Sequence, residues 1–238
     1  MTAEFAIDRQ GATVVVYDAR RYPSFEPAVF DDDGWQRDPA EVHVTTGRGG
    51  VRMLDVGNEI WVRRHYHRGG FVSKFVHDRY LWRGITRSRP ARELHLLARM
   101  RAEGLPVPLP VAGRAVRVGM GYRADLITVL MPGTFPLSRA MATGSVEASV
   151  WPRVGSMLGR FHGGGYDHPD LTAHNILVDD LGQPSLLDFD NAVQRRGNGW
   201  KAARIRRLLR SLRKVALETG TEFDPKGWAA LLGAYQSA

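Results

Sequence analysis

The chain has 238 residues, of which 43% are hydrophobic and 24% charged, as in globular proteins large enough to bury a sizeable core. It contains no cysteine, which excludes disulfides and thiolate metal sites. No apolar run reaches the length needed to cross a bilayer, and the N-terminus lacks the pattern of a signal peptide. The formal net charge of +8 predicts an anionic partner, such as phospholipid headgroups, nucleic acid or a phosphorylated substrate.

Residues 1–40 differ from the rest of the chain in charge. They carry eight acidic and four basic residues, so the basic surplus belongs to the remaining residues. Their one strand candidate is ATVVVYDA at 12–19, and Pro-rich and Asp-rich segments follow it. We therefore expect residues 1–40 to form a loosely organised leader segment.

From residue 41 the pattern becomes regular. Three short β-branched runs are separated by glycine-containing turns, which is typical of an antiparallel meander; they are EVHVTT, VRMLDV and EIWVRRHY. A helix is predicted over 89–104, because Leu94 and Leu97 recur at helical spacing and Gly104 can cap the C-terminus. Further strands are expected within 105–133, and from about Val146 the pattern becomes helical.

This order of elements predicts an α+β fold with two lobes. We expect a β-rich N-lobe with one helix over residues 41–131 and a mostly helical C-lobe over residues 132–238. The junction is expected near Met131–Gly133.

Three polar residues border a predicted hairpin in the second lobe. The segment HPDLTAHNILVDD at 168–180 contains Asp170 and Asn175, and Asp188 ends the following run SLLD. If ILV and SLL form two short antiparallel strands, all three side chains come close together. Two carboxylates and an amide are hard oxygen ligands, suited to Mg²⁺ with bound nucleotide phosphates and poorly suited to zinc. Phosphoryl transfer requires such a set.

These motifs resemble those of the protein-kinase-like superfamily. His168-Pro-Asp170-Leu171 with Asn175 resembles the catalytic loop motif H-x-D-L-x-x-x-x-N, and Asp188-Phe189-Asp190 stands where the metal-binding D-F-G motif is expected. The resemblance implies a kinase with ATP in the cleft of a two-lobed fold. It implies that Asp170 is the catalytic base and that Asn175 and Asp188 hold Mg²⁺.

The resemblance also implies a nucleotide-binding set in the first lobe. A basic residue on the third strand, paired with a helix Glu, is expected to contact the nucleotide phosphates. Glu93 fits the helix position, but the strand offers Arg63 and Arg64 in place of Lys, and we favour Arg64, which shares a strand face with Val62. The phosphate-covering turn is expected at Gly47, Gly49 and Gly50.

Nearly the whole chain resembles the kinases of 3-deoxy-D-manno-octulosonic acid (Kdo), which are related to heptose kinases of lipopolysaccharide core assembly. The resemblance rests on WVRRHYHRGG, RELHLLARMRAEGLPVPLPVA and the two motifs above. It implies transfer of the ATP γ-phosphate to the 4-hydroxyl of Kdo on the lipid A precursor, at the cytoplasmic face of the Gram-negative inner membrane. Asp190 in place of Gly, the absence of an A-P-E segment and the short chain after Asp188 favour a small-molecule or lipid-linked acceptor over a protein.

A basic amphipathic helix is predicted over 200–220. Its apolar positions fall on one face, and seven basic residues cover the rest; these are Lys201, Arg204, Arg206, Arg207, Arg210, Arg213 and Lys214. No acidic residue stands among them. We therefore weigh two interpretations: the basic face is simply exposed to solvent, or it makes a peripheral contact with an anionic membrane surface. No recognition-helix motif or aromatic-studded β-surface supports nucleic acid as the partner.

Other interpretations stay open for the individual residues. The polar residues of the two motifs could simply form turns. The glycines 47, 49 and 50 could form a hairpin turn without binding phosphate. Glu93 could be a surface partner of a neighbouring Arg. His162 and His168 are expected to be structural. The alternatives for function are a heptose or other small-molecule kinase of the same fold, and a catalytically inactive kinase-like module that binds glycolipid.

Overall fold

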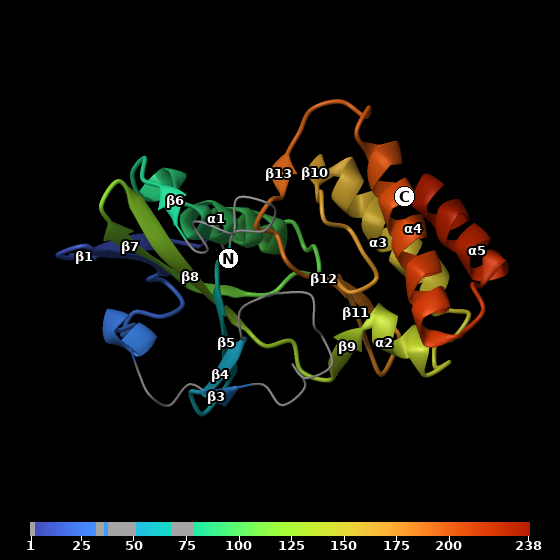
Figure 1. Cartoon of the computed structure of the whole chain (residues 1–238), viewed down its shortest axis with the longest axis horizontal. Coiled ribbons are helices and arrows are strands. Elements are labelled where there is room, and N and C mark those ends of the chain that lie inside the picture. The colour runs from blue at the N-terminus through green and yellow to red at the C-terminus, as the bar shows by residue number, and fades with distance from the viewer. Residues whose placement is uncertain (1–2, 32–35, 38–50, 68–78) are drawn as a thin grey trace. The chain divides into compact units, whose positions relative to one another are not determined.

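The computed structural model describes residues 3–31, 36–37, 51–67 and 79–238. The chain forms two compact units (Figure 1). Unit 1 comprises Met1–Ala102 and Pro108–Leu130, and unit 2 comprises Glu103–Val107 and Met131–Ala238. Among the described residues, no helix has both the length and the apolar character of a membrane span.

Unit 1 is built on an antiparallel sheet with strand order β1-β2-β7-β8-β5-β4-β3, in which β6 also pairs with β8. Its strands are β1 (Phe5–Gln10), β2 (Thr13–Asp18), β3 (Gln36–Arg37), β4 (Arg52–Asp55), β5 (Ile60–His65), β6 (Tyr80–Leu81), β7 (Pro110–Val118) and β8 (Gly121–Val129). In its described residues the helices are the 3-10 helices η1 (Pro27–Asp31) and η4 (Ile85–Arg87) and the α-helix α1 (Arg89–Ala102).

Helix α1 packs directly on β7 and β8. Its apolar stripe is buried, with Leu94, Leu97 and Met100 at most 1% exposed. The close approach depends on Gly113 of β7, because a Cβ atom there would lie 2.8 Å from both Leu94 Cδ1 and Pro90 Cβ. This packing fixes the position of Glu93, which lies on the buried side of the same helix.

The described residues of the predicted leader are part of unit 1. Strand β2 pairs with β7 along Thr13–Tyr17, and β1 pairs with β2 at the edge of the sheet. The side chains of Val14, Val15 and Val16 are at most 4% exposed. The expectation of loose organisation was therefore wrong for this stretch, because its run of three valines supplies enough apolar surface to join the core.

Unit 2 is mostly helical. Its elements are β9 (Thr134–Pro136), α2 (Leu137–Ala142), α3 (Val150–Gly163), β10 (Tyr166–Asp167), β11 (Ile176–Asp179), β12 (Pro184–Leu186), β13 (Val193–Gln194), α4 (Lys201–Thr219) and α5 (Pro225–Gln236). Helices α3 and α5 lie side by side (Figure 1). Gly155 permits their contact, because a Cβ atom there would lie 2.1 Å from the carbonyl oxygen of Leu231.

The predicted α+β class is confirmed, with a β-rich part that holds α1 and a mostly helical second part. The predicted hairpin of unit 2 is confirmed as β11 and β12, and strands β4, β5, β7 and β8 occupy the predicted segments. The strand expected at EVHVTT lies outside the described residues.

Candidate active site

The hairpin β11–β12 brings Asn175 and Asp188 to the same end of unit 2. Its register pairs Ile176 with Leu186, and the N–H of Leu187 donates to the carbonyl oxygen of Asn175 at 2.8 Å. Asn175 therefore directly precedes the first strand, and Asp188 directly follows the residue opposite Asn175. The predicted convergence of these two side chains follows from this local pairing.

Asp188 has an unusual backbone conformation. Among the described residues it is the only one other than glycine with a positive φ, at 63°. Such a conformation costs on the order of 1–3 kcal/mol, is tolerated by Asp better than by most residues, and is frequent at functional sites. It places the side chain of Asp188 in an exposed position, whereas the next residue, Phe189, is 1% exposed.

His168 ties the loop that carries Asp170 to the end of the hairpin. Its Nε2–H donates to the carbonyl oxygen of Leu187 at 2.8 Å, and its ring packs edge-on against Phe189. Burial lowers the pKa of His168, so the ring stays neutral. His168 is 3% exposed, which agrees with the structural role expected for it.

Asp170 is held at three atoms. Its Oδ1 accepts from Arg207 Nη2 at 2.9 Å, its Oδ2 accepts from Asn191 Nδ2 at 3.1 Å, and its carbonyl oxygen accepts from Asn175 Nδ2 at 2.9 Å. The side chain of Asp170 is nevertheless 39% exposed. A carboxylate that is both oriented and accessible can align a hydroxyl group and accept its proton.

The side chains present fit a magnesium ion. The Nδ2 group of Asn175 is used as a donor to Asp170, so its Oδ1 is the end left for a cation. Asn175 Oδ1 and the Asp188 carboxylate are hard oxygen donors at one end of the hairpin. In the described part of the chain, no three His, Asp or Glu side chains form a metal-binding group. Mg²⁺ suits such a sparse set, because waters and nucleotide phosphates complete its coordination.

In unit 1, Glu93 forms a buried hydrogen-bonded group with Arg64 and Tyr66. Arg64 Nη2 lies 2.7 Å from both carboxylate oxygens of Glu93, and the hydroxyl of Tyr66 donates to Glu93 Oε2 at 2.6 Å. Glu93 is 3% exposed and Arg64 is 27% exposed at the side chain. Glu93 is therefore a buried partner of a strand residue and not a surface partner of a neighbour on its own helix.

Arg63 and Arg64 point to different partners because successive residues of β5 face opposite sides of the sheet. The guanidinium of Arg63 donates to the carbonyl oxygen of Phe30, and burial lowers its pKa. Of the two arginines that the sequence left open, Arg64 is the one that contacts Glu93. Gly47, Gly49 and Gly50 lie outside the described residues.

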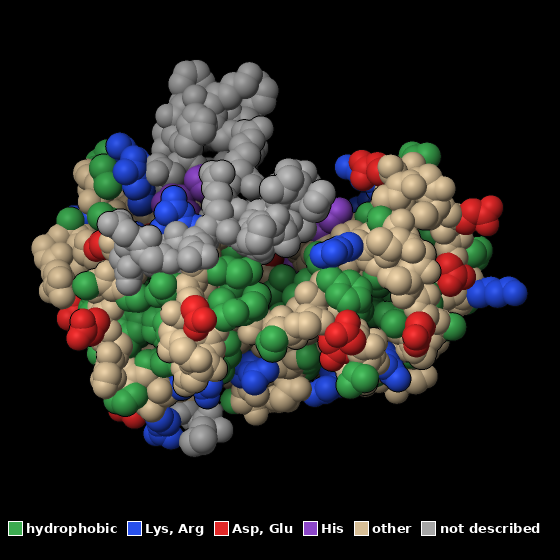
Figure 2. Space-filling model, turned by 90° about the horizontal axis from the view of Figure 1, so that it is seen from below, with side chains coloured by type: hydrophobic (Ala, Val, Ile, Leu, Met, Phe, Trp, Pro, Cys, Tyr) green, Lys and Arg blue, Asp and Glu red, His purple; other side chains and the backbone are tan. Residues whose placement is uncertain are grey.

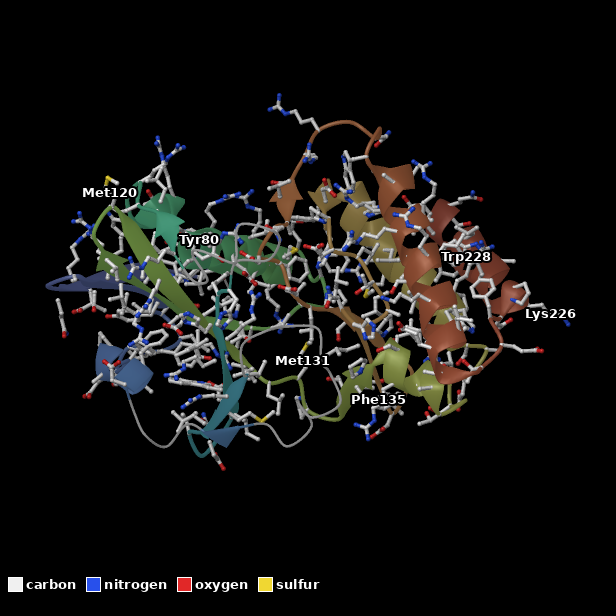
Figure 3. The ribbon with its side chains drawn as sticks, viewed as in Figure 1. Tyr80, Met120, Met131, Phe135, Lys226 and Trp228 are labelled. Carbon is white, nitrogen blue, oxygen red and sulfur yellow. The ribbon has the colours of Figure 1, made fainter. Side chains whose placement is uncertain are left out.

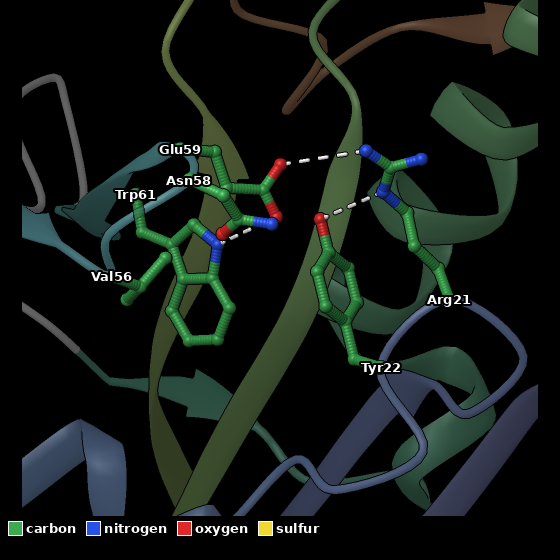
Figure 4. A pocket seen from close by; sticks show the side chains of 6 residues that line it. All are labelled: Arg21, Tyr22, Val56, Asn58, Glu59 and Trp61. Atoms are coloured by element: carbon green, nitrogen blue, oxygen red, sulfur yellow. Dashed lines mark hydrogen bonds and ion pairs between the residues drawn. The ribbon is translucent and has the colours of Figure 1, made fainter.

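A surface hollow of ≈ 360 Å³ in unit 1 contains none of the predicted site residues (Figure 4). It is lined by Arg21, Tyr22, Val56, Asn58, Glu59 and Trp61. Figure 4 shows that its polar groups pair with one another: Arg21 with Tyr22 and Glu59, and the indole N–H of Trp61 with Glu59. The polar groups of Arg21, Tyr22, Glu59 and Trp61 are therefore already engaged.

Helix α4 contributes residues to the site that the sequence did not reveal. Besides the contact of Arg207 with Asp170, Arg204 donates to both oxygens of Asp167, and Ser211 Oγ accepts from the backbone N–H of Ala173 at 3.0 Å. Asp167 is fully buried and also pairs with Arg195 at 2.7 Å. The expectation of seven uncompensated charges was wrong for Arg204 and Arg207, and also for Lys214, whose Nζ lies 3.6 Å from Glu218 Oε1. Arg204 and Arg207 are three residues apart, as are Asp167 and Asp170. This matching interval was the sequence feature from which the two ion pairs could have been predicted.

The sequence is similar to a described protein family and to named proteins. Residues 32–235 match the model of the "Lipopolysaccharide kinase (Kdo/WaaP) family". A protein of Stenotrophomonas maltophilia (strain K279a), named 3-deoxy-D-manno-octulosonic acid kinase, is 37% identical over 231 residues, which cover 96% of this chain and 92% of that protein. A protein of the same name from Vibrio vulnificus (strain YJ016) is 34% identical over 227 residues, covering 95% and 96%.

Solved structures with a partial likeness include two kinases. The bifunctional kinase-methyltransferase WbdD aligns with a TM-score of 0.48 and 16% identity, over 85% of this chain and 45% of that chain. A glucosamine kinase (crystal form B) aligns with a TM-score of 0.44 and 13% identity, over 100% and 82%.

The family predicted from the motifs around Asp170 and Asp188 is confirmed by the family model and by these curated relatives. The chain belongs to the lipopolysaccharide kinase (Kdo/WaaP) family and is a phosphotransferase.

Proposed function

We propose that the chain transfers the γ-phosphoryl group of ATP to the 4-hydroxyl of Kdo on the lipid A precursor during assembly of the lipopolysaccharide inner core. The observation that carries the proposal is the oriented, accessible carboxylate of Asp170 beside Asn175 and the hairpin end, in a chain whose curated relatives are named Kdo kinases. In this reaction the acceptor oxygen forms a bond to phosphorus, and the bond between phosphorus and the bridging oxygen of ADP breaks.

Asp170 acts as the catalytic base in this proposal. It accepts a hydrogen bond from the acceptor hydroxyl and takes its proton late in the transfer. Arg207 and Asn191 hold the two carboxylate oxygens, which limits rotation of the side chain. Positioning of this kind contributes much of the catalysis in phosphoryl transfer, because the chemistry needs little covalent participation by the protein.

Asn175 and Asp188 would hold Mg²⁺. When bound, the ion neutralises charge on the nucleotide phosphates. We assign nucleotide contact to Arg64, because Glu93 and Tyr66 fix its guanidinium and Arg can donate two parallel hydrogen bonds to a phosphate as Lys cannot. Gly47, Gly49 and Gly50 are proposed to cover the phosphates.

We further propose that the protein binds peripherally to the cytoplasmic face of the Gram-negative inner membrane through α4. We define the outer stripe of α4 as Arg206, Arg210, Arg213 and Leu217, which recur at spacings of three and four residues and are all exposed. Leu217 is 83% exposed, so the stripe combines cationic groups with an apolar side chain. This combination suits anionic headgroups above an acyl region, and nucleic acid is not expected as a partner.

On the face of the molecule drawn in Figure 2, Lys and Arg side chains lie among Asp and Glu side chains.

The proposal is tested with purified protein, labelled ATP, Mg²⁺ and two acceptors, a lipid A precursor with Kdo and the same precursor without it. We expect labelled phosphate only on the first. Labelled phosphate on the precursor without Kdo would show that the acceptor sugar is wrong. ATP consumption that is identical with and without either acceptor would contradict the proposal as a whole.

A further inference from the structure

Arg207 is the basic side chain that contacts the catalytic carboxylate. Its Nη2 donates to Asp170 Oδ1 at 2.9 Å, while its own side chain remains 42% exposed. The neighbouring arginines are engaged elsewhere, since Arg204 binds both oxygens of Asp167 and Arg195 binds the same carboxylate. Among the described residues, Arg207 donates to Asp170 alone and so uses one of its five N–H donors.

The proposed acceptor creates an electrostatic problem at this point. The acceptor is a sugar acid, and its carboxyl carbon is separated by three bonds from the carbon that bears the 4-hydroxyl. An acceptor that places this hydroxyl on Asp170 therefore brings a second carboxylate close to Asp170. Two carboxylates at short distance repel, and the nucleotide phosphates add further negative charge.

We infer that Arg207 binds the carboxylate of the acceptor and thereby selects sugar acids over neutral sugars. The inference rests on the proposed function, because it assumes that the acceptor hydroxyl lies on Asp170. A guanidinium suits this task, since it can share its planar donors between two carboxylates. Arg207 thus offsets the repulsion and also orients the sugar. The Nε–H of Arg207 is buried, so a ligand would meet the Nη groups in the exposed part of the side chain.

The inference is tested by comparing a natural acceptor with a neutralised one. The acceptors are the Kdo-containing lipid A precursor and its derivative in which the Kdo carboxylate is converted to a carboxamide, both in detergent micelles. Wild-type protein, Arg207→Gln and Arg207→Lys are assayed for kcat/KM. Binding of each acceptor without nucleotide is measured by calorimetry, which gives a readout independent of turnover.

Lys226→Gln is the matched control, because it also removes one positive charge from unit 2. Lys226 lies in the first turn of α5, is exposed, and points away from the helices (Figure 3). It should change neither the rate nor the preference between acceptors.

We expect wild type to prefer the acid over the amide about ten- to a hundredfold, which corresponds to one charge-assisted hydrogen bond. Arg207→Gln should abolish or invert this preference, both in kcat/KM and in binding, and Arg207→Lys should keep part of it. If Arg207 only positions Asp170, or only contacts the transferred phosphoryl group, Arg207→Gln lowers the rate equally for both acceptors and leaves the preference unchanged.

Failure of the inference and failure of the proposed function give different results. Equal use of acid and amide by wild type would overturn the role of Arg207 while leaving the kinase activity intact. This comparison and Arg207→Lys decide the question even if Arg207→Gln does not fold. If wild type neither bound nor phosphorylated either acceptor, the proposed acceptor would be wrong, and the role of Arg207 would be wrong with it.

Discussion

The hydrogen-bonded group of Glu93, Arg64 and Tyr66 should stabilise unit 1 and support nucleotide binding. In Glu93→Gln the buried carboxylate becomes a neutral amide. The guanidinium of Arg64 then no longer has a negatively charged partner at its two 2.7 Å contacts. Removing one partner of a buried pair costs about 3–5 kcal/mol. The 27% exposure of Arg64 places the expected loss near the lower limit, about 3 kcal/mol.

Tyr66→Phe separates the contributions within this group. It removes the hydroxyl that donates to Glu93 Oε2 at 2.6 Å and keeps the ring that packs under Arg64. A hydrogen bond to a charged group contributes about 1.5–3 kcal/mol, so we expect a loss of about 1.5 kcal/mol. Because the two residues are in contact, the double variant should lose less than the sum of the single losses.

The assay is urea denaturation followed by circular dichroism, with hydrogen exchange of α1 to assign the loss to unit 1. Glu222→Gln is the control, because Glu222 is exposed and should change stability by less than about 0.5 kcal/mol. Glu93→Gln should also raise KM for ATP about tenfold as Arg64 loses its fixed position. The reasoning would be refuted if Glu93→Gln destabilised no more than Tyr66→Phe and left KM for ATP unchanged.

Four further predictions concern unit 2. Asp170→Ala should lower kcat by about 10²–10⁴-fold while leaving ATP affinity nearly unchanged, as measured by turnover and nucleotide titration; retention of more than a few per cent of the activity would exclude Asp170 as the base. Asp188→Asn should weaken Mg²⁺-dependent nucleotide binding and activity together, and an unchanged Mg²⁺ titration would remove Asp188 from the metal site. Changing Arg206, Arg210 and Arg213 to Gln should weaken binding to anionic vesicles in flotation by about two decades, at ~1 kcal/mol for each charge, and by less at high salt. Unchanged flotation would mean that the outer stripe of α4 is exposed to solvent and does not bind the membrane. Burial, with Lys201 nearby, lowers the pKa of His162 to about 4, so the folded state stays neutral while the unfolded state gains a proton below about pH 6.5. Stability should therefore fall as the pH drops from 6.5 to 4, by up to about 1.4 kcal/mol per pH unit from this group. In pH-dependent urea denaturation His162→Gln should flatten this slope, and an unchanged slope would contradict the prediction.

The hairpin and the helix that the sequence predicted correctly depend on local patterns. Asn175 and Asp188 border one hairpin, and its short turn fixes which residues come together. The helix that carries Glu93 could be predicted for the same reason. Its apolar spacing and Gly104, which follows its C-terminus, lie within one segment of the sequence.

The parts that the sequence did not reveal depend on distant segments. Arg207 and Asp170 are 37 residues apart, and the acid that compensates Arg207 lies in a different element, so the composition of α4 alone suggested free charge. The choice between Arg63 and Arg64 depends on which face of β5 meets α1, and that is set by packing on β7 and β8. Likewise, β2 joins the sheet only through its pairing with β7, about a hundred residues later in the chain.

The most direct test of the central claim is the position of the new phosphate on the product. Wild-type protein is incubated with ATP, Mg²⁺ and the Kdo-containing lipid A precursor, and the product is analysed by two-dimensional ³¹P–¹H NMR. The account predicts one phosphate on the 4-oxygen of Kdo for each ATP consumed, and no such product with Asp170→Ala. A phosphate on any other oxygen, or the same product from Asp170→Ala, would contradict it.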